Sequence, residues 1–227
     1  MTAAAIVVAG GEGTRMRSQV NKIFLDIGGH SILERSLALF ETSPLVDEMV
    51  LVGRSADLPR FEQLPGRFRK LRSIVAGGDI RHGSEFAGLR AIAPRIDAGQ
   101  IDTVLVHDAV RPFASEDLLR RLLASHETIG CVPGLPVDRH TVLVENGSIA
   151  AYPRNLFAIQ TPQAFQATWL LEAHNKAARQ GFVGTDTASV VEWAGGDIRV
   201  IEGEPDNIKI TTPADLAHAE RIASDRI

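Results

Sequence analysis

The 227-residue sequence contains a single cysteine, Cys131, and its acidic residues outnumber the basic ones, giving a net charge of −4. One cysteine excludes an internal disulfide framework and favours a reducing compartment, so we expect a cytoplasmic protein. The lack of a basic excess argues against nucleic acid as a bulk partner, because binding to phosphates requires a surplus of lysine and arginine. Small and apolar neighbours predict that Cys131 is a buried residue rather than a nucleophile.

The sequence also lacks an apolar run of membrane-spanning length. Its N-terminus has neither the charged segment nor the cleavage site of a signal peptide, so we predict neither secretion nor membrane association. What is present is an ordinary globular composition, 44% hydrophobic, over a length that suits one α/β domain. We therefore expect residues 1–227 to form one domain.

The most informative stretch lies near the start of the chain. The β-branched residues 6–8 predict a buried strand, and three glycines follow within residues 10–13. Glycines allow the backbone to approach an anion closely, and Arg15 and Lys22 add positive charge, so this stretch predicts a phosphate site. The spacing matches neither the GxGxxG fingerprint nor a Walker P-loop, and a tight turn without a ligand is the alternative.

Strand and helix patterns alternate along much of the chain. Short apolar runs at 49–52, 73–75 and 103–106 predict buried strands, each followed by a turn or loop and a helical pattern. This repetition predicts a Rossmann-like, doubly wound, mostly parallel sheet. Because ligands bind beyond the carboxyl ends of such strands, residues 78–79 and Asp108 should lie near the glycine turn.

Polar residues mark the expected helix ends. Ser31 and Glu34 predict a capping box, Ser115 a second cap, and Thr212 the start of the last helix. The helical pattern that follows residues 78–79 is expected to end before Pro94.

Residues 135–155 depart from this alternation. β-Prone runs at 141–144 and 149–152 flank Asn146-Gly147, which is a strong signal for a hairpin. A two-stranded ribbon is only marginally stable alone, so it must pack on something. Exchange with a second subunit as an arm and packing back on its own domain are both open.

Several charged residues stand where chemistry is expected. Asp108 ends a predicted strand, where a carboxylate can hold Mg²⁺ or a substrate hydroxyl, and Arg111 can pair with a phosphate. A structural ion pair is the alternative for both. Lys209 lies in a short predicted extended segment, facing either substrate or solvent. Asp186 is expected to cap a helix, and His107 is assigned no role.

These motifs, taken in order, resemble those of one enzyme family. They are Gly13-Thr14-Arg15-Met16, His107-Asp108-Ala109-Val110-Arg111-Pro112-Phe113, Gln160-Thr161-Pro162-Gln163, Thr185-Asp186 with Ala188-Ser189, and Asp206-Asn207-Ile208-Lys209. The set spans nearly the full chain and resembles the 2-C-methyl-D-erythritol 4-phosphate cytidylyltransferases of the non-mevalonate isoprenoid pathway. The resemblance implies transfer of CMP from CTP to that sugar-alcohol phosphate, with Mg²⁺ and release of pyrophosphate.

The resemblance also implies a role for individual residues. Arg15 and Lys22 fall on the two cations that stabilise the transition state. The expectation that Asp108 holds the metal rests on its place at the strand end. The arm of the family crosses to a partner subunit, which predicts a homodimer. The nucleotide side comprises Ala9, Gly10, Gly11, Gly13, Gly78, Asp79 and Ser84. The residues that fall on the methylerythritol phosphate site are Asp108, Arg111, Thr141, Arg154, Thr161 and Lys209, with Thr141 and Arg154 serving the neighbour's site.

The sequence departs from the family pattern at three places. Val8 and Asn21 stand where the family usually has proline, and the arm is one residue longer. Asp138 and His140 are therefore alternatives to Thr141.

Other functions remain open. The first loop also resembles that of CDP-ribitol-forming enzymes, so ribitol-5-phosphate cytidylyltransferase is the alternative activity. A dinucleotide-binding oxidoreductase and an inactive binding module are alternatives of other classes.

The implied reaction calls for cations rather than a general base. A phosphate monoester has a second pKa of about 6, so the attacking group is already an anion near neutral pH. The difficulty is to bring this anion to a triphosphate and to stabilise the crowded α-phosphate. The basic residues available for this are Arg15, Lys22, Arg111, Arg154 and Lys209.

Overall fold

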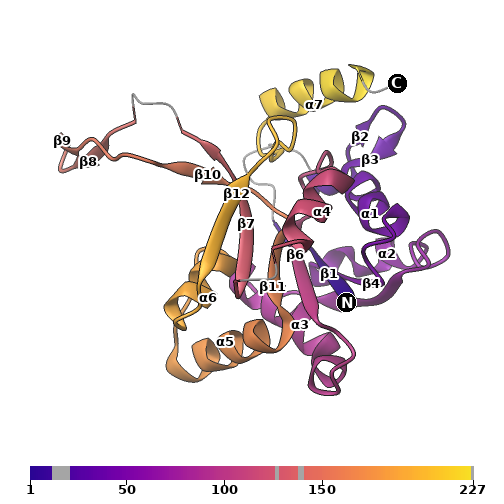
Figure 1. Ribbon diagram of the computed structural model, residues 1–227. Coiled ribbons are helices and arrows are strands. Elements are labelled where there is room, and N and C mark those ends of the chain that lie inside the picture. Colours follow the sequence, from indigo (N-terminus) through magenta and orange to yellow (C-terminus); the bar gives the residue numbers. More distant parts are fainter. Residues whose placement is uncertain (12–20, 126–127, 138–140, 226–227) are drawn as a thin grey trace.

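The computed structural model describes residues 1–11, 21–125, 128–137 and 141–225. The strands of its central sheet are β1 (Ala3–Ala9), β4 (Glu48–Gly53), β5 (Leu71–Ala76), β6 (Thr103–Asp108), β7 (Gly130–Pro136), β10 (Phe157–Ile159), β11 (Gln163–Gln166) and β12 (Ile198–Glu202). Their order is β10-β7-β11-β6-β1-β4-β5, with β12 beside β7. β1, β4, β5 and β6 pair in parallel, which confirms the predicted doubly wound sheet (Figure 1).

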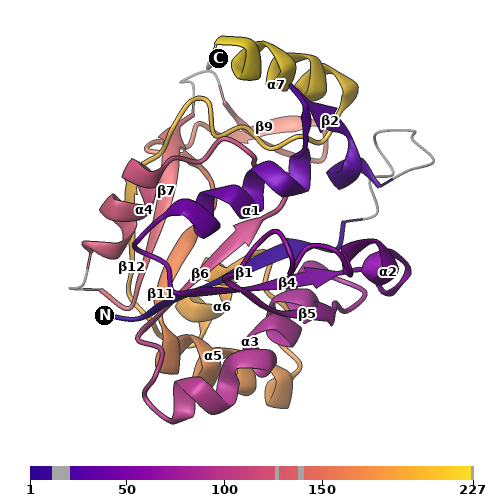
Figure 2. The same ribbon diagram turned by 90° about the vertical axis from the view of Figure 1, so that its right-hand side faces the viewer.

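Helices cover both faces of this sheet. Successive side chains of a strand point to opposite faces, so Val7 packs in one core layer and Ile6 in the other. Figure 2 shows α1 above the sheet and α3 and α5 below it. The helices are α1 (Ile32–Thr42) and α4 (Glu116–Leu123) on the first face, and α3 (Arg81–Asp97), α5 (Ala167–Gln180) and α6 (Thr187–Trp193) on the second.

Short elements extend the fold at the carboxyl edge of the sheet. The last helix packs on the small β2-β3 ribbon through Ile27, Ile222 and neighbouring apolar residues. Among the described residues, no helix combines the length and apolar character needed to cross a membrane. The short elements are η2 (Lys22–Phe24), β2 (Asp26–Ile27), β3 (His30–Ser31), η3 (Ser55–Asp57), α2 (Leu58–Phe61) and α7 (Pro213–Asp225).

Helix starts agree with the polar residues of the sequence. Ser31 and Glu34 form the predicted capping box, in which the Glu34 amide donates to Ser31 Oγ at 3.2 Å. Ser115 caps α4, Asp186 caps α6, and Thr212 Oγ1 accepts from the amide of the third residue of α7. Local capping signals therefore define these boundaries correctly.

Two expectations about the backbone are wrong. α3 continues through Pro94 to Asp97 rather than ending before it. Pro94 is exposed, as is Arg90, the residue whose carbonyl loses its helical donor, while Ile92 and Ile96 stay buried and keep both turns packed. Residues 207–210 form no strand. They belong to the irregular segment that connects β12 to α7.

The predicted hairpin is present as an arm that projects from the domain (Figure 1). It consists of β8 (Leu143–Glu145) and β9 (Ser148–Ala151), and every residue of both strands is exposed. Asn146 and Gly147 have φ angles of 50° and 78°, as the tight turn requires. Within the described residues β8 and β9 pair only with each other, so packing back on the domain is the wrong alternative.

Candidate active site

A cavity of about 380 Å³ lies beyond the carboxyl ends of β1 and β6, at the start of α3. It brings together the glycine turn, residues 78–79 and Asp108, which confirms the proximity expected from a parallel sheet. The lining residues are Val8, Ala9, Gly10, Gly11, Lys22, Ile23, Gly78, Asp79, Ile80, Arg81, Ser84, Asp108, Val110 and Lys209.

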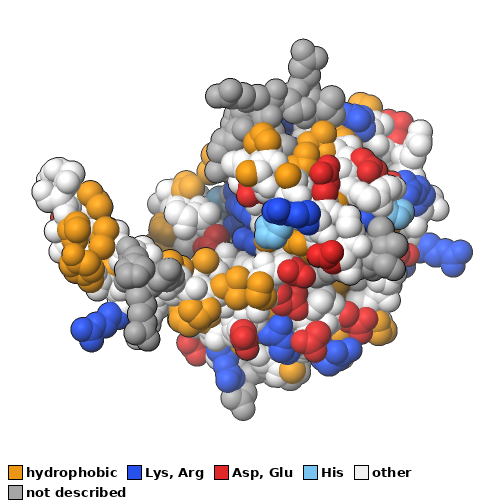
Figure 3. All heavy atoms as spheres, turned by 90° about the horizontal axis from the view of Figure 1, so that it is seen from above, with side chains coloured by type: hydrophobic (Ala, Val, Ile, Leu, Met, Phe, Trp, Pro, Cys, Tyr) orange, Lys and Arg blue, Asp and Glu red, His pale blue; other side chains and the backbone are white. Residues whose placement is uncertain are grey.

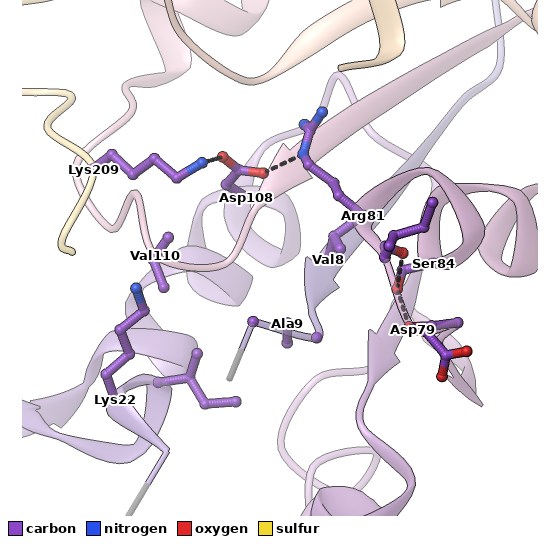
Figure 4. A pocket seen from close by; sticks show the side chains of 14 residues that line it. Val8, Ala9, Lys22, Asp79, Arg81, Ser84, Asp108, Val110 and Lys209 are labelled. Carbon is purple, nitrogen blue, oxygen red and sulfur yellow. Dashed lines mark hydrogen bonds and ion pairs between the residues drawn. The ribbon is translucent and has the colours of Figure 1, made fainter. Parts of the chain in front are cut away.

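Asp108 is the centre of a cationic cluster in this pocket. Lys209 Nζ lies 2.7 Å from its Oδ2 and Arg81 Nε 3.1 Å from its Oδ1. Figure 4 shows these two side chains reaching the carboxylate from opposite sides. Arg111 Nε lies 4.0 Å from Oδ2. Burial alone raises the pKa of Asp108, but Arg81 and Lys209 hold it well below its usual range, so Asp108 is ionised at neutral pH.

Hydrogen bonds fix the backbone around Asp108. Its amide donates to Thr161 Oγ1 at 2.9 Å, and that hydroxyl lies 3.1 Å from His107 Nδ1. The other ring nitrogen, Nε2, lies 3.1 Å from the Arg111 carbonyl. Burial lowers the pKa of His107 to about 4, so the ring is neutral. A neutral ring fits this pattern when Nδ1 accepts and Nε2 donates, which makes His107 structural.

Arg111 is held by carbonyl groups from two other segments. Its Nη1 donates to the Asn207 carbonyl at 2.8 Å, and its Nη2 donates to the Ile159 carbonyl at 3.4 Å. Arg111 is buried and does not line the cavity itself. It contributes positive charge from behind Asp108.

The side of the pocket that faces β1 is built by close backbone packing. A Cβ atom on Gly77 would lie 2.5 Å from Ser84 Oγ, and one on Gly78 would lie 3.1 Å from the Gly83 Cα. Ser84 Oγ donates to the Ile80 carbonyl at 3.1 Å, within the first turn of α3. Ile80 gives this helix no side-chain cap, so an anion suits the partial positive charge of its N-terminus.

Lys22 lies in η2 on the opposite wall and is 7% exposed. The preceding residue anchors this short helix. Asn21 Oδ1 accepts from the Ile23 amide at 3.3 Å, and Asn21 Nδ2 donates to Asp57 at 2.8 Å. Arg54 Nε also donates to Asp57, at 2.7 Å. Asn21, which replaces the proline usual in the resembled family, thus connects Lys22 to a partly buried ion pair.

Among the described residues, three further predicted site residues do not line this pocket: Thr161, Thr141 and Arg154. Thr161 acts from behind it, through the Asp108 amide. Thr141 and Arg154 belong to the arm region and lie elsewhere on the chain. Gly13 and Arg15, and the alternatives Asp138 and His140, fall outside the described residues.

Arg81 is the main pocket residue that sequence reasoning missed. It is the first residue of α3 and contacts Asp108, 27 positions further along the chain. The available signal was its position two residues after Asp79, at the end of a glycine turn and the start of a helical pattern.

The pocket offers little to a metal ion by itself. Among the described residues, no group of three or more His, Cys, Asp or Glu side chains could hold one. Of the described residues that line the cavity, Asp108 and Asp79 carry carboxylates, and Figure 4 shows them pointing apart. Mg²⁺ is commonly held by one or two carboxylates together with substrate phosphates, and Asp108 fits that arrangement if it exchanges one cationic contact.

Comparison with known proteins gives one consistent result. The family model described as 2-C-methyl-D-erythritol 4-phosphate cytidylyltransferase matches residues 3–225. Curated relatives of that name include one from Geobacter metallireducens, 41% identical with all of both chains covered, and one from Geobacillus kaustophilus, 39% identical with 98% and 97% covered.

Solved structures agree with these matches. The 4-diphosphocytidyl-2C-methyl-D-erythritol synthase of Anaerococcus prevotii superposes with a TM-score of 0.85 at 29% identity, over 98% of this chain and 96% of that one. The cytidylyltransferase of Thermus thermophilus gives a TM-score of 0.73 at 31% identity, over 99% and 100%.

Proposed function

The chain belongs to the family of 2-C-methyl-D-erythritol 4-phosphate cytidylyltransferases, and from this premise we propose how its pocket carries out the reaction. The reaction transfers the cytidylyl group of CTP to 2-C-methyl-D-erythritol 4-phosphate. It yields 4-diphosphocytidyl-2-C-methyl-D-erythritol and pyrophosphate, in the synthesis of isoprenoid precursors. CDP-ribitol formation is not favoured, because the matched family model and the relatives described above carry the methylerythritol name.

One structural observation carries the proposal. The glycine turn after β1, the cationic cluster around Asp108 and the side chain of Lys22 all face the same cavity. A triphosphate suits the bare backbone and the start of α3, whereas a phosphorylated alcohol suits Asp108 and its cations. We assign Ala9, Gly10, Gly11, Gly13, Gly78, Asp79 and Ser84 to CTP. Asp108 and Lys209 are assigned to the alcohol phosphate, with Arg111 and Thr161 supporting them from behind the cavity.

The chemistry of this pocket is charge compensation. The attacking phosphate is already an anion at neutral pH, so no side chain needs to remove a proton from it. Lys22, Lys209 and Arg81 place positive charge on several walls of the cavity. Fixed cations lower the repulsion between the two substrates and stabilise the charge that develops on the α-phosphate oxygens. The Asp108 carboxylate can accept hydrogen bonds from the hydroxyl groups of the alcohol.

We also propose that Mg²⁺ takes part, held mainly by the triphosphate and water with Asp108 as the protein ligand. Such an ion supplies further charge neutralisation at the phosphates. A requirement for Mg²⁺ stays a prediction.

The arm supports a homodimer in which each arm reaches the other subunit's site. Its exposed apolar side chains have no partner surface within the described part of their own chain, and Figure 3 shows them gathered on the projecting arm. A second copy of the chain would cover them. These residues are Leu143, Val144, Ile149 and Tyr152. Thr141 and Arg154 are then proposed to serve the neighbour's site, in a protein that we expect in the cytoplasm.

The reaction is tested by identifying its product. The protein is incubated with Mg²⁺, the methylerythritol phosphate and one of the four ribonucleoside triphosphates at a time, and products are identified by mass spectrometry. We expect the diphosphocytidyl product from CTP alone. Equal products from all four nucleotides would refute the assignment of the glycine side to CTP.

A further inference from the structure

A buried polar cluster lies behind the active site, between α3, α5 and the start of α6. Glu85 is its centre, with only 1% of the residue exposed. Its Oε1 lies 2.6 Å from Arg81 Nη1, and its Oε2 lies 3.9 Å from His174 Nε2. His174 is stacked on His82 with ring centroids 4.9 Å apart. None of these groups except Arg81 lines the substrate cavity.

Arg81 joins this cluster to the active site. Its Nη1 faces Glu85, while its Nε lies 3.1 Å from Asp108 Oδ1. Glu85 and Arg81 are one helical turn apart on α3, so they face the same side of the helix. A continuous path of charged groups therefore runs from the buried Glu85 through Arg81 to Asp108.

We propose that Glu85 is a positioning residue for the transfer reaction: its buried carboxylate fixes the Arg81 guanidinium, and Arg81 in turn fixes Asp108 for the alcohol phosphate. This inference rests on the proposed function of the pocket. It assigns a task to a residue that never touches substrate.

The charges around Asp108 explain why the Arg81 side chain needs a second contact that holds it in place. Arg81, Arg111 and Lys209 surround a single carboxylate, and these three cations repel one another. An arginine side chain has many rotamers, and ordering one costs conformational entropy. A second anion on the far side of Arg81 offsets the repulsion and gives the Arg81 guanidinium a charged partner on each side.

The location of Glu85 is costly for the fold, as is common for groups that serve a site. Burial raises the pKa of Glu85 to about 7 even though Arg81 favours the charged form. The other groups that act on Glu85 are Thr187 and Asp186 at the start of α6, and Asp108 on β6. His174 faces it from α5 and is neutral, because burial lowers the pKa of that histidine to about 3.

The chain supplies a matched control for a substitution at Glu85. Glu48 on β4 is also buried, 4% exposed, and pairs with Arg95 of the same helix α3. This pair lies at the other end of α3 and does not line the cavity. Glu85→Leu and Glu48→Leu therefore remove the same kind of ion pair, one linked to Asp108 and one not.

Kinetics with both substrates form the first test. We expect Glu85→Leu to raise KM for the methylerythritol phosphate and lower its kcat/KM at least about tenfold, since a charged contact is lost. KM for CTP should change little, and Glu48→Leu should stay within about twofold of the wild type. Glu85→Gln, which retains an acceptor, should restore part of the activity. Equal losses in Glu85→Leu and Glu48→Leu would overturn the proposal.

A double variant separates positioning from a general loss of packing. In an Arg81→Met background, Glu85→Leu should cause almost no further loss of kcat/KM, because the path through Arg81 is already broken. Additive losses would contradict the proposal. Melting temperatures at pH 8 check that Glu85→Leu and Glu48→Leu are both folded at the assay temperature, since each loses one partner of an ion pair.

A crystal structure of Glu85→Leu tests the positioning without any assay. We expect the Arg81 guanidinium to leave Asp108, while Glu48→Leu keeps that contact. An unchanged contact between Arg81 and Asp108 in Glu85→Leu would refute the proposal. If the wild type releases no pyrophosphate with CTP and the methylerythritol phosphate, the proposed function fails, and this structure still decides the role of Glu85.

Discussion

The Thr161 hydroxyl accepts a hydrogen bond from the Asp108 amide at 2.9 Å, across 53 positions of sequence. The bond joins the carboxyl end of β6 to the segment that precedes β11. The same hydroxyl lies 3.1 Å from a neutral, buried His107. The backbone that presents the Asp108 carboxylate is therefore held from behind by a side chain that does not line the cavity.

Thr161→Val tests this support. Valine keeps the shape of threonine but leaves the Asp108 amide and His107 Nδ1 without a partner, which costs roughly 1–3 kcal/mol of folding stability. We expect kcat/KM for the methylerythritol phosphate to fall about tenfold as Asp108 shifts. Thr161→Ser retains the hydroxyl and should stay near the wild type. Denaturant unfolding measures the change in stability, and steady-state kinetics measure the change in kcat/KM. Unchanged kinetics in Thr161→Val would show that the Thr161 hydroxyl does not hold Asp108 in place for the reaction.

Lys22 is expected to stabilise the transition state directly. Lys22→Ala should lower kcat at least about 100-fold, the scale of removing one fixed electrostatic stabiliser. Lys176→Ala, on the far face of the domain, removes the same charge from α5 and serves as the control. Near-normal turnover in Lys22→Ala would remove this lysine from the mechanism.

Asn21 should matter through the placement of Lys22. Asn21→Ala removes the cap of η2, at about 1 kcal/mol, and the bond to Asp57. We expect kcat to fall about tenfold through misplacement of Lys22. Asn21→Ser retains a capping oxygen but not the bond to Asp57. Compared with Asn21→Ala, it should therefore regain more of the lost stability than of the lost kcat. Full recovery of both by serine would show that Asp57 plays no part.

The arm predicts complementation between two inactive variants. If Arg154 serves the neighbour's site, a mixed dimer of Lys22→Ala and Arg154→Ala chains contains one intact site. We expect each variant to be nearly inactive alone and activity to return when the two are unfolded and refolded together. No return of activity in mixtures shown to contain mixed dimers would place Arg154 in its own subunit's site.

Two buried histidines predict how stability depends on pH. Burial lowers the pKa of His107 to about 4 and that of His174 to about 3, whereas both take up protons near pH 6.5 when unfolded. The unfolded state then takes up more protons at these two histidines, so both lower stability as pH drops below 6.5, whereas Glu85, whose pKa is raised to about 7, contributes in the opposite direction. Each histidine should cost roughly 2 kcal/mol at pH 5 relative to pH 8.

His174→Phe isolates one of these contributions. Phenylalanine can stack on His82 and Phe86 as His174 does, and it cannot take up a proton. The loss of unfolding free energy between pH 8 and pH 5 should shrink in His174→Phe, as measured by urea unfolding at both pH values. An unchanged loss would mean that His174 is protonated in the folded protein.

Signals confined to a few neighbouring residues were predictable from the sequence. Ser31 with Glu34, Asn146 with Gly147, and the β-branched run before Gly10 each define a local geometry, and the structure has all three. Pro94 was misleading, because its exposed position lets solvent replace the lost hydrogen bond.

Contacts between residues far apart in the chain were harder to predict from the sequence. The parallel sheet predicted that Asp108 would meet the glycine turn, but no local pattern indicated that Arg81 and Lys209 converge on its carboxylate. No sequence pattern indicated the role of Glu85. This role depends on α5 packing over it and on its contact with Arg81, which also reaches Asp108 on β6. Motif resemblance supplied Lys209, while Arg81 and Glu85 required the structure.

Pyrophosphate release tests the assigned reaction most directly. The protein, CTP and Mg²⁺ are combined with the methylerythritol phosphate or with ribitol 5-phosphate in parallel, and release is followed over time. We predict rapid release with the methylerythritol phosphate and little with ribitol 5-phosphate. Release with ribitol 5-phosphate alone, or with neither alcohol, would contradict the assignment of this pocket to methylerythritol phosphate cytidylyl transfer.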